Sequence, residues 1–189
     1  MNTKEYRKVF NIFMEGRKTE PAYFGLLKQQ CNEVSLLLHT PTTRTDPRQI
    51  LGRAKKHAKK NPLGKNEEIW IVVDVDKREK DTFISLFEWD DESKKHGVAI
   101  SNPSFEYWLL LHYDTGDAIQ SLNDCINRLR QHLPNYKKNN LNLNQIEIHN
   151  IERAISNAMK RHQYCHDWHV DNYSTVYLLV DKIIEETKN

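Results

Sequence analysis

The sequence predicts an α/β fold with three layers: a mostly parallel sheet of about four strands, helices on both of its faces, and a helical C-terminal part. Two observations predict this fold. Short apolar runs alternate with helical patterns through about residue 112, and the run at 68–73 is almost continuously apolar, as is typical of strands buried on both faces. Only helical patterns follow. We expect one domain over residues 1–189, with an α/β core at 1–115 and a helical part at 116–189.

Apolar runs and capping residues define the expected elements in order. Val9–Met14 is an apolar run bounded by charge, which predicts a buried strand. Thr19 predicts a helix start, and Asp46 before Pro47 predicts another. The expected strands are 9–14, 34–39, 68–73 and 97–100. The expected helices are one beginning at 19, and then 47–60, 80–93, 105–112, 117–133, 144–164 and 174–186.

Charge is segregated along the chain, although the net charge of the 189 residues is only +2. Residues 44–65 contain eight Lys or Arg and one acid, whereas residues 74–94 contain eight acids and four bases. This order indicates a surface for a polyanion beside a centre that binds cations, and two solvated helix faces are the alternative. The predicted nucleic-acid-binding residues of the basic segment are Arg48, Arg53, Lys55, Lys56, Lys59 and Lys60.

Several classes of protein do not fit this sequence. The longest apolar runs have five residues and a membrane span needs roughly 20, so we expect no membrane span. Three distant cysteines do not suggest a disulfide scaffold, and reduced thiols in the cytoplasm are the simple expectation. The segment 63–66 contains Gly-Lys without the rest of a phosphate-binding loop, so any ATPase would be a separate chain.

Acidic residues follow the predicted strands, where open α/β sheets bind their ligands. They are Glu15 and Glu20 after the first strand, Asp74 and Asp76 after the third, and Glu106 in the helix after the fourth. In an extended chain, Asp74 and Asp76 point to the same side and can bind one cation together. Carboxylate oxygens with no Cys or His nearby suit Mg²⁺ or Mn²⁺.

Structural interpretations of these residues remain open. Asp74 could cap the next helix, and Asp76 could pair with Lys77 or Arg78. Gly16 could let a phosphate approach the backbone, or it could supply a turn with positive φ.

Two polar residues near the third acidic segment are candidates for support of the site. Asn102, which precedes Pro103, could cap the next helix or steer Asp74 or Asp76. His112 could contact a phosphate or play a structural role. The aromatic and leucine side chains between them are expected in the core.

A histidine-rich segment near the C-terminus has a spacing that could bind zinc. Residues four apart share one face of a helix, so His162 and His166 could chelate Zn²⁺. A polar helix end with unrelated histidines is the simpler interpretation. The residues of this segment are His162, Cys165, His166 and His169.

Four segments carry a resemblance to a known family. They are FMEGRKTEPAYF at 13–24, VVDVD at 72–76, SNPSFEYWLLLHY at 101–113 and YKK at 136–138. The chain resembles the RloB-like family, Toprim-related proteins found near restriction-modification and abortive-infection genes. The resemblance covers nearly the whole chain, and the segment at 101–113 is its most specific part.

The resemblance implies a Toprim-like sheet and metal-dependent phosphodiester chemistry. Toprim domains bind divalent metal with a Glu after the first strand and a D-x-D after a later one, which fall here on Glu15, Asp74 and Asp76. The family's further acids fall on Glu20 and Glu106. The gap from Glu15 to Glu20 is one residue longer than in the overcoming-lysogenization-defect nucleases, which are similar.

The expected reaction is cleavage of DNA or RNA by a toxic effector of anti-phage, abortive-infection defence, with tRNA as one candidate substrate. Lys138 could contact the pentavalent phosphate or be a surface lysine, and Lys137 beside it is expected to bind nucleic acid. The alternative is a non-catalytic Toprim-like module that binds nucleic acid or docks on an AAA or ABC-type ATPase. A primase- or topoisomerase-like activity is a third hypothesis. The oligomeric state is open.

Overall fold

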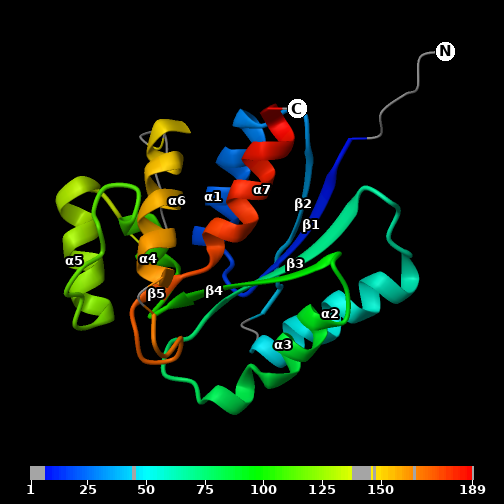
Figure 1. The fold of residues 1–189 in the computed structure, drawn as a ribbon, viewed down its shortest axis with the longest axis horizontal. Helices are drawn as coiled ribbons and strands as arrows, with labels where there is room; N and C mark the ends of the chain where they lie inside the picture. The colour runs from blue at the N-terminus through cyan, green and yellow to red at the C-terminus, as the bar shows by residue number, and fades with distance from the viewer. Residues whose placement is uncertain (1–6, 44–45, 138–145, 147, 164, 189) are drawn as a thin grey trace.

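A five-stranded sheet with the order β2-β1-β3-β4-β5 lies between two groups of helices (Figure 1). The computed structural model describes residues 7–43, 46–137, 146, 148–163 and 165–188. The strands are β1 (Val9–Met14), β2 (Ser35–His39), β3 (Glu67–Asp74), β4 (His96–Asn102) and β5 (Tyr173–Ser174). The first four are parallel, and β5 is antiparallel to β4. The expected α/β fold is confirmed, with a fifth strand too short to leave a sequence pattern.

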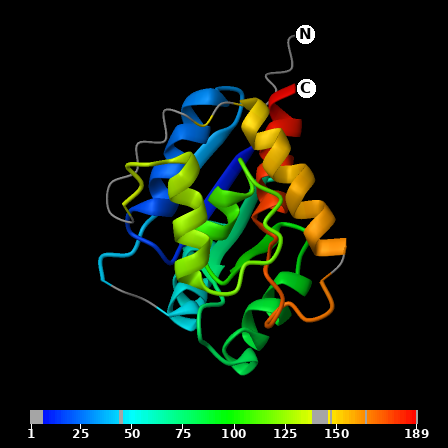
Figure 2. The same cartoon turned by 90° about the vertical axis from the view of Figure 1, so that its left-hand side faces the viewer.

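Helices cover both faces of the sheet (Figures 1 and 2). One face packs against α1 (Thr19–Gln30), α4 (Phe105–Leu110), α5 (Leu122–His132), α6 (Ile148–Gln163) and α7 (Val176–Lys188). The other packs against α2 (Pro47–Lys60) and α3 (Ile84–Asp91), and the short 3₁₀ helix η1 (Lys80–Thr82) precedes α3.

The pleat of the central strands divides the core into two clusters. Along β3, Trp70 and Val72 face the larger helical layer, whereas Ile69, Ile71 and Val73 face α2 and α3. All five are buried, because alternate side chains of a strand point to opposite faces and both faces are covered. This arrangement leaves the ends of the strands as the place where polar side chains can gather.

Local signals predicted the starts of three helices correctly, at residues 19, 47 and 105, but only one of the three capping residues. Asp46 caps α2: its Oδ1 accepts from the backbone N–H of Gln49 at 2.9 Å, and the Gln49 side chain accepts from the N–H of Asp46. Thr19 is not a cap but the buried first residue of α1. Asn102 is not a cap either, because it still pairs with Tyr173 as the last residue of β4, and α4 begins after Ser104.

The C-terminal part of the chain packs on the sheet. The β5 strand extends the sheet beside β4, and the hydroxyls of Ser101 and Ser174 lie 2.9 Å apart across this pair. Helix α7 supplies buried side chains such as Leu179 and Val180 to the larger core cluster. Within the part of the chain that the structure describes, no helix combines the length and the apolar character needed to cross a membrane.

Candidate active site

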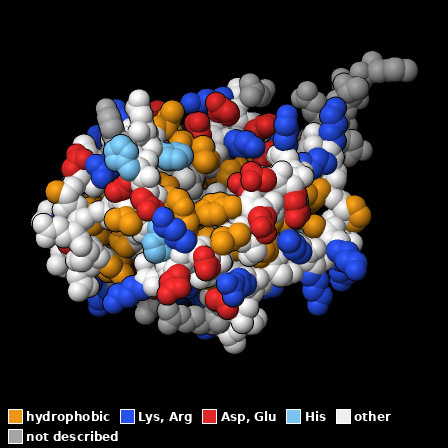
Figure 3. Space-filling view, turned by 60° about the horizontal axis from the view of Figure 1, so that its bottom comes forward, with side chains coloured by type: hydrophobic (Ala, Val, Ile, Leu, Met, Phe, Trp, Pro, Cys, Tyr) orange, Lys and Arg blue, Asp and Glu red, His pale blue; other side chains and the backbone are white. Residues whose placement is uncertain are grey.

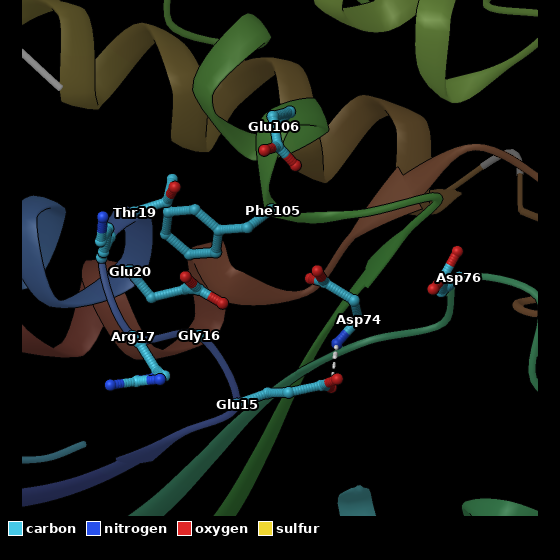
Figure 4. Close-up of a pocket in the computed structure, with 10 residues that line it drawn as sticks. Glu15, Gly16, Arg17, Thr19, Glu20, Asp74, Asp76, Phe105 and Glu106 are labelled. Carbon is cyan, nitrogen blue, oxygen red and sulfur yellow. Dashed lines mark hydrogen bonds between the residues drawn. The ribbon is translucent and has the colours of Figure 1, made fainter. Parts of the chain in front are cut away.

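The sheet order brings Glu15 and Asp74 together at the carboxyl ends of two neighbouring strands. Parallel β1 and β3 pair in the register Met14 to Val72, so the residues after them leave the sheet side by side. The backbone N–H of Glu15 donates to Val72 O at 3.1 Å. The backbone N of Asp74 lies 3.5 Å from Oε2 of Glu15 (Figure 4). The two predicted metal ligands are therefore neighbours.

A pocket of about 660 Å³ opens above this pair (Figure 4). Figure 4 shows the carboxylates of Glu20 and Asp74 facing one another, with Glu106 on the far wall. The pocket collects acids from three segments that are distant in sequence. Its lining residues are Glu15, Gly16, Arg17, Lys18, Thr19, Glu20, Asp74, Asp76, Phe105 and Glu106.

Glu20 is a buried carboxyl in the first turn of α1. Its pKa is raised from 4.5 to about 7, mainly by burial and also by the nearby charges of Glu106 and Glu15, although backbone hydrogen bonds at Glu20 and Gly16 oppose the shift. Among the described residues, no Lys or Arg forms an ion pair with Glu20. Within the described residues, the Glu20 carboxyl therefore has no cationic partner.

Gly16 makes room for the Glu20 carboxyl. A Cβ on Gly16 would lie 1.8 Å from Oε2 of Glu20, which no real contact allows. Its φ is not positive, since Gly116 is the glycine with positive φ. The turn interpretation of Gly16 is therefore wrong, and its role in this structure is the close approach of a carboxylate to the backbone.

Glu106 is held in place by two hydroxyl donors. Ser104 Oγ donates to its Oε2 at 2.6 Å, and Tyr136 Oη donates to its Oε1 at 2.8 Å. Glu106 is buried at the start of α4, and burial and the adjacent carboxylate raise the pKa of Tyr136. This network fixes one wall of the pocket. It also brings the YKK segment to the site, with Lys137 exposed and Lys138 outside the described residues.

Asp76 does not extend the line of β3. The strand ends at Asp74, and Asp76 has a φ of 51°, which turns the chain. The backbone N–H of Asp76 donates to Pro103 O at 2.9 Å, and its side chain is exposed. The extended geometry expected for the D-x-D is therefore wrong. The expected cap on Asp74 is also wrong, since Glu79 precedes the next helical turn.

Arg78 is a residue of the site that the sequence did not reveal. Its guanidinium forms a forked ion pair with the Glu15 carboxylate, and its Nη1 also donates to Asp74 O at 2.9 Å. The expected pairing of Arg78 with Asp76 is wrong, because the turn at Asp76 carries Arg78 back to Glu15. The sequence feature that could have pointed to a role for Arg78 in the site is its position two residues after the D-x-D motif.

Among the described residues, Arg17 and Lys18 are the basic side chains that line the pocket, and both are exposed. Helix α2 runs from the end of β2 back toward the start of β3, away from the pocket. Its 14 residues span about 21 Å. Arg48 donates to Asp81 O at 3.4 Å near the pocket end, whereas Lys59 and Lys60 lie at the far end.

Other basic residues of α2 have local contacts. Arg53 donates to Thr40 O at 2.9 Å and lies over the Phe13 ring, and Lys55 Nζ lies 4.0 Å from the Glu92 carboxylate. Lys56 is exposed. On the face shown in Figure 3, Lys and Arg side chains are interspersed with Asp and Glu rather than gathered in one basic patch.

Asn102 and His112 act on the protein rather than on a ligand. The Asn102 side chain donates to His169 O at 2.8 Å, so it holds the 168–169 loop instead of steering Asp74 or Asp76. His112 is fully buried: its Nδ1 donates to Trp108 O at 3.0 Å, and its Nε2 lies 3.2 Å from Tyr23 Oη. Burial lowers the pKa of His112 to about 4. The prediction that His112 contacts a phosphate is therefore wrong, and its structural interpretation is confirmed.

The histidine-rich segment forms separate contacts. His162 Nδ1 bonds Tyr177 Oη at 2.9 Å, and His169 Nε2 donates to the Arg78 carbonyl. The backbone N–H of His166 donates to Asp171. In the described ranges, no three His, Cys, Asp or Glu side chains lie close enough to hold a metal ion, and this segment is no exception.

The pocket acids fit a divalent cation by their chemistry. Glu15, Glu20 and Asp74 offer only oxygen atoms, which Mg²⁺ and Mn²⁺ prefer, and the raised pKa of Glu20 indicates unbalanced negative charge. Glu20 and Asp74 face one another and would hold the ion (Figure 4). Glu15 could join them only by exchanging its partner Arg78.

A comparison with protein families gives a match over most of the chain. The model of the family described as RloB-like protein matches residues 10–183. This span contains every pocket-lining residue. No curated protein and no solved structure matches the chain.

Proposed function

The chain belongs to the RloB-like family, and from that premise we propose that it is a metal-dependent phosphodiester nuclease, the toxic effector of an anti-phage, abortive-infection defence. One observation carries the catalytic part of the proposal. Glu15 and Glu20, from the segment after β1, meet Asp74, from the end of β3, in one pocket beyond the carboxyl ends of these two strands. Burying like charges together is costly, so such a cluster favours a function that needs them.

The pocket acids divide the chemistry between them. Asp74 and Glu20 would hold Mg²⁺ or Mn²⁺, which when bound would polarise the phosphoryl oxygen and stabilise the leaving oxygen. Glu20 must lose its proton to bind the ion, so its pKa of about 7 predicts that metal binding strengthens as the pH rises through neutrality. Glu106 is held by Ser104 and Tyr136 and would keep the wall beside Glu20 in place.

The rim of the pocket supports a nucleic-acid substrate. Arg17 and Lys18 lie on the turn that carries Glu15 and would contact backbone phosphates. Such contacts weaken steeply with salt and do not read sequence. DNA and RNA, including tRNA, are both within the proposal. An ATPase of the AAA or ABC type would act as a separate partner.

A specific observation favours the second candidate, a non-catalytic module that binds nucleic acid or docks on an ATPase. Glu15 already has a cationic partner in Arg78, and in the described residues no three ligands converge. A module of this kind would keep the basic rim and would not need a divalent cation.

The test is cleavage of plasmid, single-stranded DNA and total tRNA in Mg²⁺ or Mn²⁺. We expect Asp74→Asn and Glu20→Gln to lose activity by about a hundredfold or more. Asp91→Asn is the matched control, because Asp91 is exposed at the end of α3 and outside the pocket. Metal binding without cleavage would point to a missing ATPase partner. No metal binding and no cleavage would leave the binding module.

A further inference from the structure

Arg78 holds one of the pocket acids, Glu15, in a forked ion pair. Both of its terminal nitrogens bond the Glu15 carboxylate, and Nη1 lies 3.2 Å from Oε2 of Glu15 and 2.9 Å from the carbonyl oxygen of Asp74. Its side chain is 20% exposed and that of Glu15 13% exposed, so the pair is partly shielded from water. A guanidinium forked onto both oxygens competes with a divalent cation for this carboxylate, because the two positive charges would repel one another across the same oxygen atoms.

Two hydrogen bonds fix the backbone of Arg78. Its N–H donates to Val75 O at 3.2 Å, and its carbonyl accepts from Nε2 of His169. The loop that carries His169 is in turn held by the side chain of Asn102. The position of Arg78 on Glu15 is therefore built into the fold, and it gives Asn102 and His169 a role as positioning residues.

We propose that Arg78 is a built-in counter-cation that competes with the divalent metal for Glu15, and that the displaced guanidinium then binds the scissile phosphate. The inference rests on the proposed function, because it assumes that metal binds at this site. A guanidinium fork fits a carboxylate and a phosphate equally well. If the guanidinium moves from the Glu15 carboxylate to the phosphate, its positive charge would lie beside the substrate only after the metal has bound.

The test measures Mn²⁺ affinity of the full chain by isothermal titration calorimetry. We expect Arg78→Gln to bind Mn²⁺ about tenfold more tightly than wild type, since an ionic hydrogen bond no longer competes for Glu15. Lys77→Gln is the matched control, because it removes one positive charge from the position next to Arg78, its side chain is exposed, and in the described residues no hydrogen bond or ion pair joins Lys77 to Glu15. Its affinity should change by less than about threefold.

A second measurement covers the case in which Arg78→Gln does not fold. In EDTA, Glu15→Gln should bind a single-stranded oligonucleotide about threefold to tenfold more tightly than Glu20→Gln, because only the first variant releases Arg78 for phosphate. Equal binding by these two variants would contradict the exchange.

The outcomes separate this inference from the proposed function. The inference alone is overturned if the wild type binds Mn²⁺ and cuts nucleic acid, but Arg78→Gln binds Mn²⁺ no more tightly than the wild type. The melting temperature of Arg78→Gln must be unchanged for this conclusion. Failure of both proteins to bind Mn²⁺ overturns the metal-dependent function together with it. Tighter Mn²⁺ binding by Arg78→Gln supports the competition for Glu15, and slower cleavage by the same variant supports the contact of Arg78 with the phosphate.

Discussion

Two buried glutamates at opposite edges of the same sheet have opposite electrostatics. Glu68, at the start of β3, is 5% exposed, and Glu20, beside the end of β1, is 6% exposed. Burial would raise the pKa of Glu68, but hydrogen bonds from Lys8, Trp70 and Lys182 outweigh it and lower the pKa. The pKa of Glu20 rises instead to about 7, because burial is reinforced by two neighbouring acids.

The comparison shows that burial alone does not decide the state of a carboxyl in this protein. At the amino edge, two lysines complete an ion-pair network, and that network serves the fold. At the carboxyl edge, Arg78 is bonded to Glu15, and within the described residues no Lys or Arg forms an ion pair with Glu20. A carboxyl edge with surplus negative charge is the part of the sheet suited to bind a cation.

The largest expected effect comes from displacing Glu20 without changing any charge. Gly16→Ala would place a Cβ 1.8 Å from Oε2 of Glu20 and push the carboxylate out of its position. We expect cleavage to fall by about a hundredfold, since a shift of about 1 Å in a reacting group can cost that much. Gly64→Ala is the control, because its Cβ would meet Glu67 at an ordinary 3.6 Å. Full activity in Gly16→Ala would show that the position of Glu20 does not matter.

A smaller effect should appear in the pH dependence of stability. The folded-state pKa of Glu20 is about 7 against an ordinary 4.5, so between these values the folded state binds more protons than the unfolded state. Stability therefore falls as the pH rises through this window. Glu20→Gln removes this cost and should be more stable than wild type by about 1–3 kcal/mol at pH 8, with little difference at pH 4. Urea unfolding in EDTA measures the free energy of unfolding of both proteins. If the difference between them does not vary with pH, the raised pKa of Glu20 is contradicted.

The order of strands and helices was predictable because its signals are local. The apolar run of Val9–Met14 and the cap at Asp46 act within a few residues, and both predictions are confirmed. The neighbourhood of Glu15 and Asp74 is not local. It depends on β1 pairing with β3 across the sheet, which no pattern within either strand encodes. Sequence reasoning could therefore name these acids but could not show that they meet.

Arg78 illustrates a second limit. Its nearness in sequence to Asp76 suggested a pair between them, but the positive φ of Asp76 redirects the chain and brings Arg78 to Glu15. A left-handed aspartate leaves no mark in composition or periodicity. The strand β5 could not be predicted from the sequence for a similar reason, since two residues are too few for an alternating pattern.

The smallest expected effect tests the amino edge of the comparison. Glu68→Gln leaves Lys8 and Lys182 without their counter-charge, but both lysines reach solvent, at 20% and 45% exposure, and this limits the cost to about 1 kcal/mol. The lowered pKa of Glu68 means that this advantage of the wild type is present above pH 4.5 and is lost as the pH falls through the folded-state value.

The rate of cleavage by Glu68→Gln should not change, because six residue steps along β3 separate Glu68 from Asp74 by about 20 Å. Urea unfolding and the nuclease assay on the same preparation measure both. If Glu68→Gln lost activity while remaining folded, the two edges would be coupled, and the division between a fold-stabilising carboxyl and a site carboxyl would not hold.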